Sequence, residues 1–181
     1  MTAFNLGMID FSWLPILPLI TISIGAMVVM LVGVRLEDED SAGLGFIALV
    51  TLLIAFVLTM FQLGQNTLAF HGSLAIDDYA VFFESVIIIA TALTVAMSLE
   101  YAADAGLAGA EYYALVLFAA LGMMLMAAAG DLIVIFLGLE TMSIAVYALA
   151  GFYLTPRLMA LAKRHIKIPR NYRRAARRLA A

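Results

Sequence analysis

Five long apolar blocks constrain this chain more than any other feature of its sequence. They cover residues 13–34, 43–63, 79–99, 112–129 and 132–154, and short polar connections separate them. A helix needs about 20 apolar residues to cross a hydrocarbon core of about 30 Å, so each block predicts one transmembrane helix. Barrel strands would alternate polar and apolar residues, which these blocks do not do. The predicted fold class is therefore all-α, a polytopic transmembrane helical bundle of about five spans.

The composition excludes several kinds of chemistry. With 65% hydrophobic and 13% charged residues, the chain has too little polar surface to cover a soluble domain. It contains no cysteine, which excludes disulfides, thiolate metal sites and iron–sulfur ligation. His71 is one of two histidines and has no partner ligands near it in the sequence, so no metal site is expected. Any electron transfer must therefore take place in another subunit.

The charges are sharply divided along the chain. Residues 1–156 hold one basic and thirteen acidic groups, a net charge of −12, whereas residues 157–181 hold nine basic groups and no acid. With five spans, Arg35 and the basic tail fall on the same side, which the positive-inside rule assigns to the cytoplasm. This predicts an external N-terminus (1–12), a transmembrane bundle (13–154) and a basic cytoplasmic tail (155–181).

Glu140 is an ionisable acid inside the last apolar block, in the stretch FLGLETMSIAVYALAGF. It lies nine residues after Asp131, which is about 13 Å along a helix axis and close to half of the apolar thickness. An acid at that depth costs roughly 2.5–3.5 kcal/mol and is by default a candidate for proton handling. Ser143 and Tyr147, three and seven residues later, extend a polar stripe on the same helical face. We expect Glu140 to be buried in the bundle and to act as a proton relay, with Ser143 and Tyr147 in support.

Two interpretations of such an acid remain open. Desolvation favours the protonated acid and a nearby cation favours the carboxylate, so a group held between the two can load and release a proton. Alternatively, a permanently protonated Glu140 could simply form a hydrogen bond to a neighbouring helix. Glu84 presents a similar choice, because it lies about 7.5 Å into the third block. There we favour a solvated charge at the membrane edge over a residue of the proton path.

Two adjacent segments resemble a known family. EYYALVLFAALGMMLMAAAGDL (111–132) and the following IVIFLGLETMSIAVYALAGF (133–152) resemble the fourth and fifth transmembrane helices of subunit N of the proton-pumping NADH-quinone oxidoreductase, respiratory complex I. DDYAVFFESVIIIATALTVAMSLEY resembles the third helix more loosely. In total, the resemblance covers roughly residues 10–152.

The resemblance implies an antiporter-like membrane subunit. The family's acid at the Glu140 position is implied to work with a lysine two helices later, in a proton path driven by quinone reduction. The parent complex is implied to use NADH, flavin, iron–sulfur clusters and quinone in other subunits, with no cofactor bound by this chain and no activity expected from it alone. The implied partners are the other membrane subunits, and the implied location is the bacterial cell inner membrane.

The end of the chain departs from the family. After residue 152 it continues as YLTPRLMALAKRHIKIPRNYRRAARRLAA, and no span contains a lysine. We expect Pro156 and Pro169 to break helical continuity, and we interpret the chain as a truncated or frameshifted subunit. The basic tail could bind anionic lipid, at about 1 kcal/mol for each cation, whereas nucleic acid is not an expected partner. Two alternatives are a subunit of a related multisubunit cation/proton antiporter and a small membrane scaffold with a lipid-binding tail.

Overall fold

The computed structural model describes residues 16–35, 41–104 and 109–165. In these ranges five α-helices follow one another, one in each predicted block: α1 (Leu17–Gly33), α2 (Ser41–Met60), α3 (Asp78–Asp104), α4 (Ala110–Ala127) and α5 (Leu132–His165). The all-α membrane fold class is thus confirmed. The expected external N-terminus, the first residues of the first span and positions 166–181 of the tail lie outside the described residues.

Four of the described helices are long and apolar enough to cross a membrane. Their apolar segments are Gly43–Met60, Asp78–Leu99, Ala110–Ala127 and Leu132–Phe152. Helix α1 is apolar but has only 17 residues, about 26 Å of helix, at the lower limit for a span.

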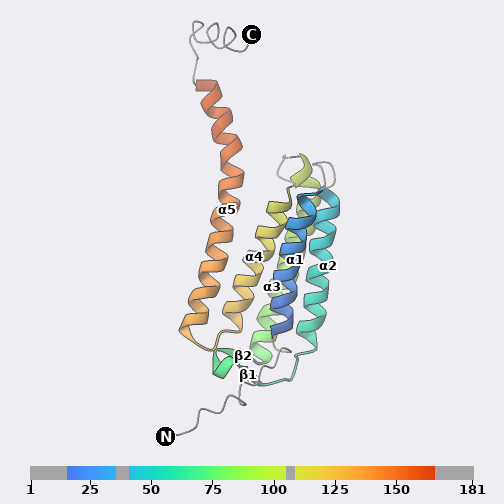
Figure 1. Ribbon diagram of the computed structural model, residues 1–181, viewed down its shortest axis with the longest axis vertical. Helices are drawn as coiled ribbons and strands as arrows, with labels where there is room; N and C mark the ends of the chain where they lie inside the picture. The colour runs from blue at the N-terminus through green and yellow to red at the C-terminus, as the bar shows by residue number, and fades with distance from the viewer. Residues whose placement is uncertain (1–15, 36–40, 105–108, 166–181) are drawn as a thin grey trace, which may run out of the picture. The chain divides into compact units, whose positions relative to one another are not determined.

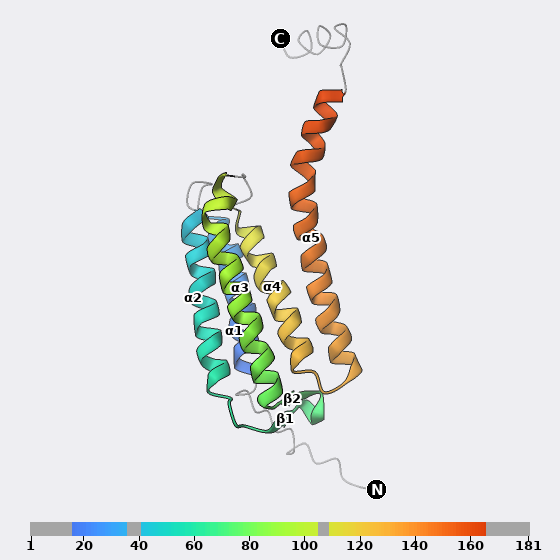
Figure 2. The ribbon, with the colours of Figure 1, turned by 180° about the vertical axis from the view of Figure 1, so that it is seen from behind.

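By its internal contacts, the chain divides into residues 1–149 and residues 150–181. In the first unit, α1 to α4 form a bundle in which α1 packs against α2 and α4, and α3 packs against α2 and α4 (Figures 1 and 2). Apolar side chains from all four helices fill its core, including Ile22, Leu52, Val95, Leu117 and Met124. This packing leaves large apolar side chains such as Phe46 and Phe82 on the outside, as expected for a bundle surrounded by lipid.

Two hydroxyl groups near the middle of the spans are paired within their own helices. Thr51 donates a hydrogen bond to the carbonyl of Ile47 (2.9 Å), and Thr91 donates one to the carbonyl of Ile87 (2.7 Å). Such bonds to the carbonyl four residues earlier satisfy a polar group where water is absent. Thr51 and Thr91 therefore fit an apolar span without marking a site.

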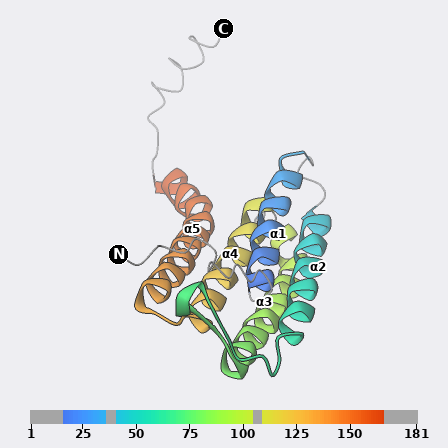
Figure 3. The same ribbon diagram turned by 60° about the horizontal axis from the view of Figure 1, so that its bottom comes forward.

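A short β-hairpin joins α2 to α3, which the sequence did not lead us to expect. Strands β1 (Thr67–Ala69) and β2 (Leu74–Ile76) pair antiparallel, with Leu68 opposite Ala75. The hairpin packs against the α4–α5 connection, because the amide of Ala75 donates to the carbonyl of Ala128 (2.8 Å) and that of Gly130 donates to the carbonyl of Ser73 (2.8 Å). The hairpin therefore ties the connection between α2 and α3 to the connection between α4 and α5 (Figure 3).

Helix α5 approaches α4 through two glycines. A Cβ atom added at Gly122 would lie 2.6 Å from the carbonyl oxygen of Gly138 and 2.6 Å from the amide nitrogen of Met142. No side chain fits in that space, so the two backbones touch directly. Small residues at a crossing allow this close approach between membrane helices.

The expected break at Pro156 is wrong, because α5 continues through this residue to His165. Proline removes one amide donor and its ring crowds the preceding turn. Membrane helices tolerate that loss where local adjustment satisfies the freed carbonyl. Pro169 lies outside the described residues.

Candidate functional site

Asp131 fixes where α5 begins. Its carboxylate accepts a hydrogen bond from the backbone amide of Val134 (2.8 Å), the usual arrangement of a helix N-cap. This amide, and then the hydroxyl of Ser73 in the hairpin, lower the pKa of Asp131 below its ordinary value. The anion is thus favoured at the start of the helix, where it also complements the helix dipole.

Glu140 lies halfway along the apolar part of α5. The segment Leu132–Phe152 has 21 residues, about 31 Å of helix, and Glu140 is nine residues beyond the Asp131 cap. The expected depth of Glu140, about 13 Å along the helix axis, therefore agrees with the observed start of α5.

The expected burial of Glu140 is not confirmed, because its side chain is exposed in the described chain. Among residues 132–152 of α5, for which burial is described, Gly138 and Ala145 are the buried positions. Glu140 follows Gly138 by two residues, a rotation of about 200°, so it points away from the face that meets α4. Tyr147 shares its direction and is 73% exposed, while Ser143 is half-buried. The three candidate residues thus share one side of α5, which the described helices leave largely uncovered.

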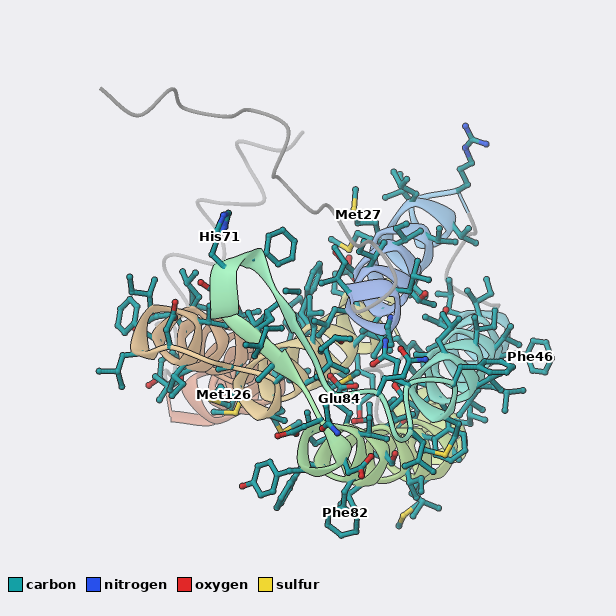
Figure 4. All side chains as sticks on the ribbon, turned by 90° about the horizontal axis from the view of Figure 1, so that it is seen from below. Met27, Phe46, His71, Phe82, Glu84 and Met126 are labelled. Carbon is teal, nitrogen blue, oxygen red and sulfur yellow. The ribbon has the colours of Figure 1, made fainter. Side chains whose placement is uncertain are left out.

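The expectation that Glu84 is a solvated charge at the membrane edge is wrong. The side chain is 2% exposed, and the hydroxyl of Thr59 on α2 donates a hydrogen bond to its Oε2 (3.4 Å). Figure 4 shows Glu84 pointing into the bundle, whereas Phe82 points outward. The helical face decides this: positions 81, 84, 88, 91 and 95 are all buried and follow the spacing of one helical stripe.

Part of this stripe was readable from the sequence, because the polar residues Glu84, Thr91 and Ser98 are spaced by seven residues and share the buried face of α3. The expectation of an edge charge rested only on the depth of Glu84 along the helix. In a bundle, a side chain close to the membrane surface can still point into the core, so both depth and face are needed.

The described residues hold no group of three or more His, Cys, Asp or Glu side chains that could bind a metal ion. His71 is exposed in the hairpin turn, where its φ of 57° and that of Phe70 (51°) are left-handed. This turn is unusual for residues other than glycine.

Taken together, apolar helices of membrane length and an acid in the middle of the last one define a multi-pass α-helical membrane protein. No family model matches the chain. It is 36% identical over 137 residues to NADH-quinone oxidoreductase subunit N of Trichlorobacter lovleyi, and 42% identical over 137 residues to subunit N 2 of Rhizobium meliloti. NAD(P)H-quinone oxidoreductase subunit 2 of a Nostoc species is 36% identical over 134 residues.

These matches cover 76%, 75% and 71% of this chain, respectively. Over the matched part the chain belongs to the family of NADH-quinone oxidoreductase subunit N, as the resemblance indicated. The matches span 28%, 28% and 26% of the length of those relatives.

Proposed function

We propose that this chain forms part of an antiporter-like membrane subunit of a proton-translocating NADH-quinone oxidoreductase, in which Glu140 carries protons in response to quinone reduction. The observation that supports this most is the position of Glu140. It lies at half depth in an apolar span, on a face that the described helices do not cover. An acid exposed to lipid there would cost roughly 2.5–3.5 kcal/mol, so the proposal assigns a protein or water partner to that face.

The proposed chemistry depends on a movable positive charge. Apolar surroundings disfavour the charged form of a carboxyl group, whereas a cation that comes close favours the carboxylate and release of the proton. Lys163 and Lys167 are the only lysines of the chain and both lie beyond the apolar segment. The cation is therefore contributed by another helix of the assembled complex, and Ser143 and Tyr147 offer hydroxyl groups along the way.

The proposed setting is the bacterial inner membrane, with the N-terminus outside and the tail in the cytoplasm. The support is the distribution of Arg35 and the nine basic residues from Arg157 onward. Beside an anionic leaflet, each basic residue contributes about 1 kcal/mol of attraction, so the tail also acts as a lipid anchor. NADH, flavin, iron–sulfur clusters and quinone are bound by other subunits.

Native gel electrophoresis of mildly solubilised membranes tests the assembly. The chain, detected by an epitope tag on its N-terminus, is expected to migrate with NADH dehydrogenase activity. Migration with an antiporter assembly free of that activity, or as a small species alone, would contradict the proposal. Deleting a redox subunit of the complex is the control, since it should shift the chain to a smaller species.

A further inference from the structure

We propose that Glu84 is a proton-binding site in the α1–α4 bundle, separate from Glu140, and that it exchanges its proton with water at the hairpin end of the bundle. Glu84 is the one charged side chain among the buried residues of the described chain. It lies six residues after Asp78, about 9 Å from the start of α3. It is therefore close to one membrane surface but turned away from it.

The surroundings of Glu84 favour binding of a proton over that of a metal ion or a fixed charge. Its carboxyl group accepts a hydrogen bond from one hydroxyl, that of Thr59, which is itself fully buried. Helices α1 (Leu17–Gly33) and α2 (Ser41–Met60) contain no charged residue that could neutralise an anion. Apolar surroundings disfavour the charged form of any carboxyl group, which can instead take up a proton and become neutral.

No other titratable group of the described chain is buried beside it in the core. The α4 residues Glu111, Tyr112 and Tyr113 lie in its first turns, at the opposite end of the bundle from Glu84. At the hairpin end, the Asp77 carboxylate accepts the amide of Ala80, that of Asp78 accepts the amide of Gly64, and His71 and Tyr79 are exposed. On α5, Glu140 and Tyr147 are exposed on the side facing away from α4. The charge of Glu84 is therefore free to change without breaking an ion pair.

A polar route leads from Thr59 toward the hairpin end of the bundle. Gln62 follows Thr59 by one turn, with its amide bonded to the Thr59 carbonyl (3.0 Å), and its side chain is buried. Gln62 also lines a cavity of about 330 Å³ together with Leu17, Leu58, Phe61 and Gln65. A cavity with polar lining and this volume has room for water. Water there, Gln62 and Thr59 make up the proposed path for the proton.

The site can also be reached from the lipid. An apolar groove of about 470 Å³ between α2 and α3 is lined by Phe56 and Ile88, each one turn from Thr59 or Glu84. A hydrophobic carbodiimide can enter such a groove, and it reacts with uncharged carboxyl groups. Reaction of dicyclohexylcarbodiimide with membranes that contain the chain therefore reports the protonation of Glu84, once the modified peptides are mapped by mass spectrometry.

We expect modification of Glu84 at neutral and acidic pH, with a rate that falls about tenfold per pH unit on the alkaline side of a single midpoint. Thr59→Val removes the hydroxyl that stabilises the carboxylate, so the midpoint should move up by about one pH unit, whereas Thr59→Ser should leave it in place. Absence of Glu84 modification at every pH, a rate independent of pH, or protection by sodium ions at constant pH would overturn the proposal.

The test is independent of the role of Glu140. Peptide mapping reads the two acids separately, and Glu140→Gln should leave the pH profile of Glu84 unchanged. If Glu140→Gln loses proton translocation but Glu84 is never modified, only this inference is refuted. If Glu84 is modified as expected but Glu140→Gln still translocates protons, only the proposed function is refuted.

Discussion

Replacing Glu140 with glutamine is expected to abolish the proton translocation that depends on this subunit in the assembled complex. Glutamine keeps the shape and the hydrogen-bonding capacity of the side chain but cannot bind and release a proton. Loss of a positioned proton-transfer group typically costs about 10²-fold or more in rate. Proton uptake into inverted vesicles, measured per NADH oxidised, should therefore fall. The uptake that remains should equal the contribution of the other proton paths of the complex.

Two matched variants distinguish this effect from damage to the fold. Glu140→Asp keeps a carboxyl group at the same depth and should retain a substantial part of the activity. Glu111→Gln makes the same chemical change at an exposed position in the first turn of α4, outside the proposed path, and should pump normally. Unaltered pumping by Glu140→Gln in a fully assembled complex would remove this residue from the mechanism.

Replacing Gly122 with leucine is expected to separate α5 from α4. Even the Cβ atom would lie 2.6 Å from both the Gly138 carbonyl oxygen and the Met142 amide nitrogen. These are backbone atoms of a helix and cannot move aside alone, so the whole of α5 must shift. Overpacking of this kind costs about 1–3 kcal/mol. Thermal unfolding of the purified chain in mild detergent, followed by far-UV circular dichroism, should show a lower midpoint temperature.

Gly43 is the matched control for that substitution. It is an exposed glycine in α2, and a Cβ atom added there would meet no atom within 4 Å. Gly43→Ala and Gly43→Leu should keep or slightly raise the midpoint, because alanine and leucine favour a helix over glycine by up to about 1 kcal/mol. An equal loss of stability at positions 43 and 122 would show that the α4–α5 crossing is not responsible.

Much of the fold could be predicted from hydropathy alone. Each predicted block contains most or all of the apolar part of one helix, since apolar runs in lipid leave the backbone little choice but to form helices, although α5 continues beyond the last block to His165. The hairpin escaped prediction because its strands have three residues each and depend on contacts with Ala128 and Gly130, far along the chain. The continuation of α5 through Pro156 was also not predicted. Proline has an unfavourable local effect on a helix, but the helix on both sides of it can accommodate the lost hydrogen bond.

The candidate site was only partly predictable. The depth of Glu140 followed from counting residues after Asp131, because the helix rise is constant. The direction in which Glu140 points depends on which face of α5 packs against α4. The small residues Gly138 and Ala145 mark that face. For Glu84 the seven-residue spacing of Glu84, Thr91 and Ser98 indicated a shared face of α3, whereas its partner Thr59 could be identified only from the packing of α2 against α3.

The central claim is that the carboxyl group of Glu140 is held at half depth, away from bulk water, in the assembled complex. Thiol labelling tests this claim directly. The chain has no cysteine, so Glu140→Cys introduces a unique thiol that can be followed by mass spectrometry of this chain. Glu111→Cys, at an exposed position, is the positive control. We predict that a bulky water-soluble maleimide labels position 111 but not position 140 from either face of the membrane, and that position 140 reacts once the complex is denatured. Rapid labelling of position 140 in intact membranes would contradict this account.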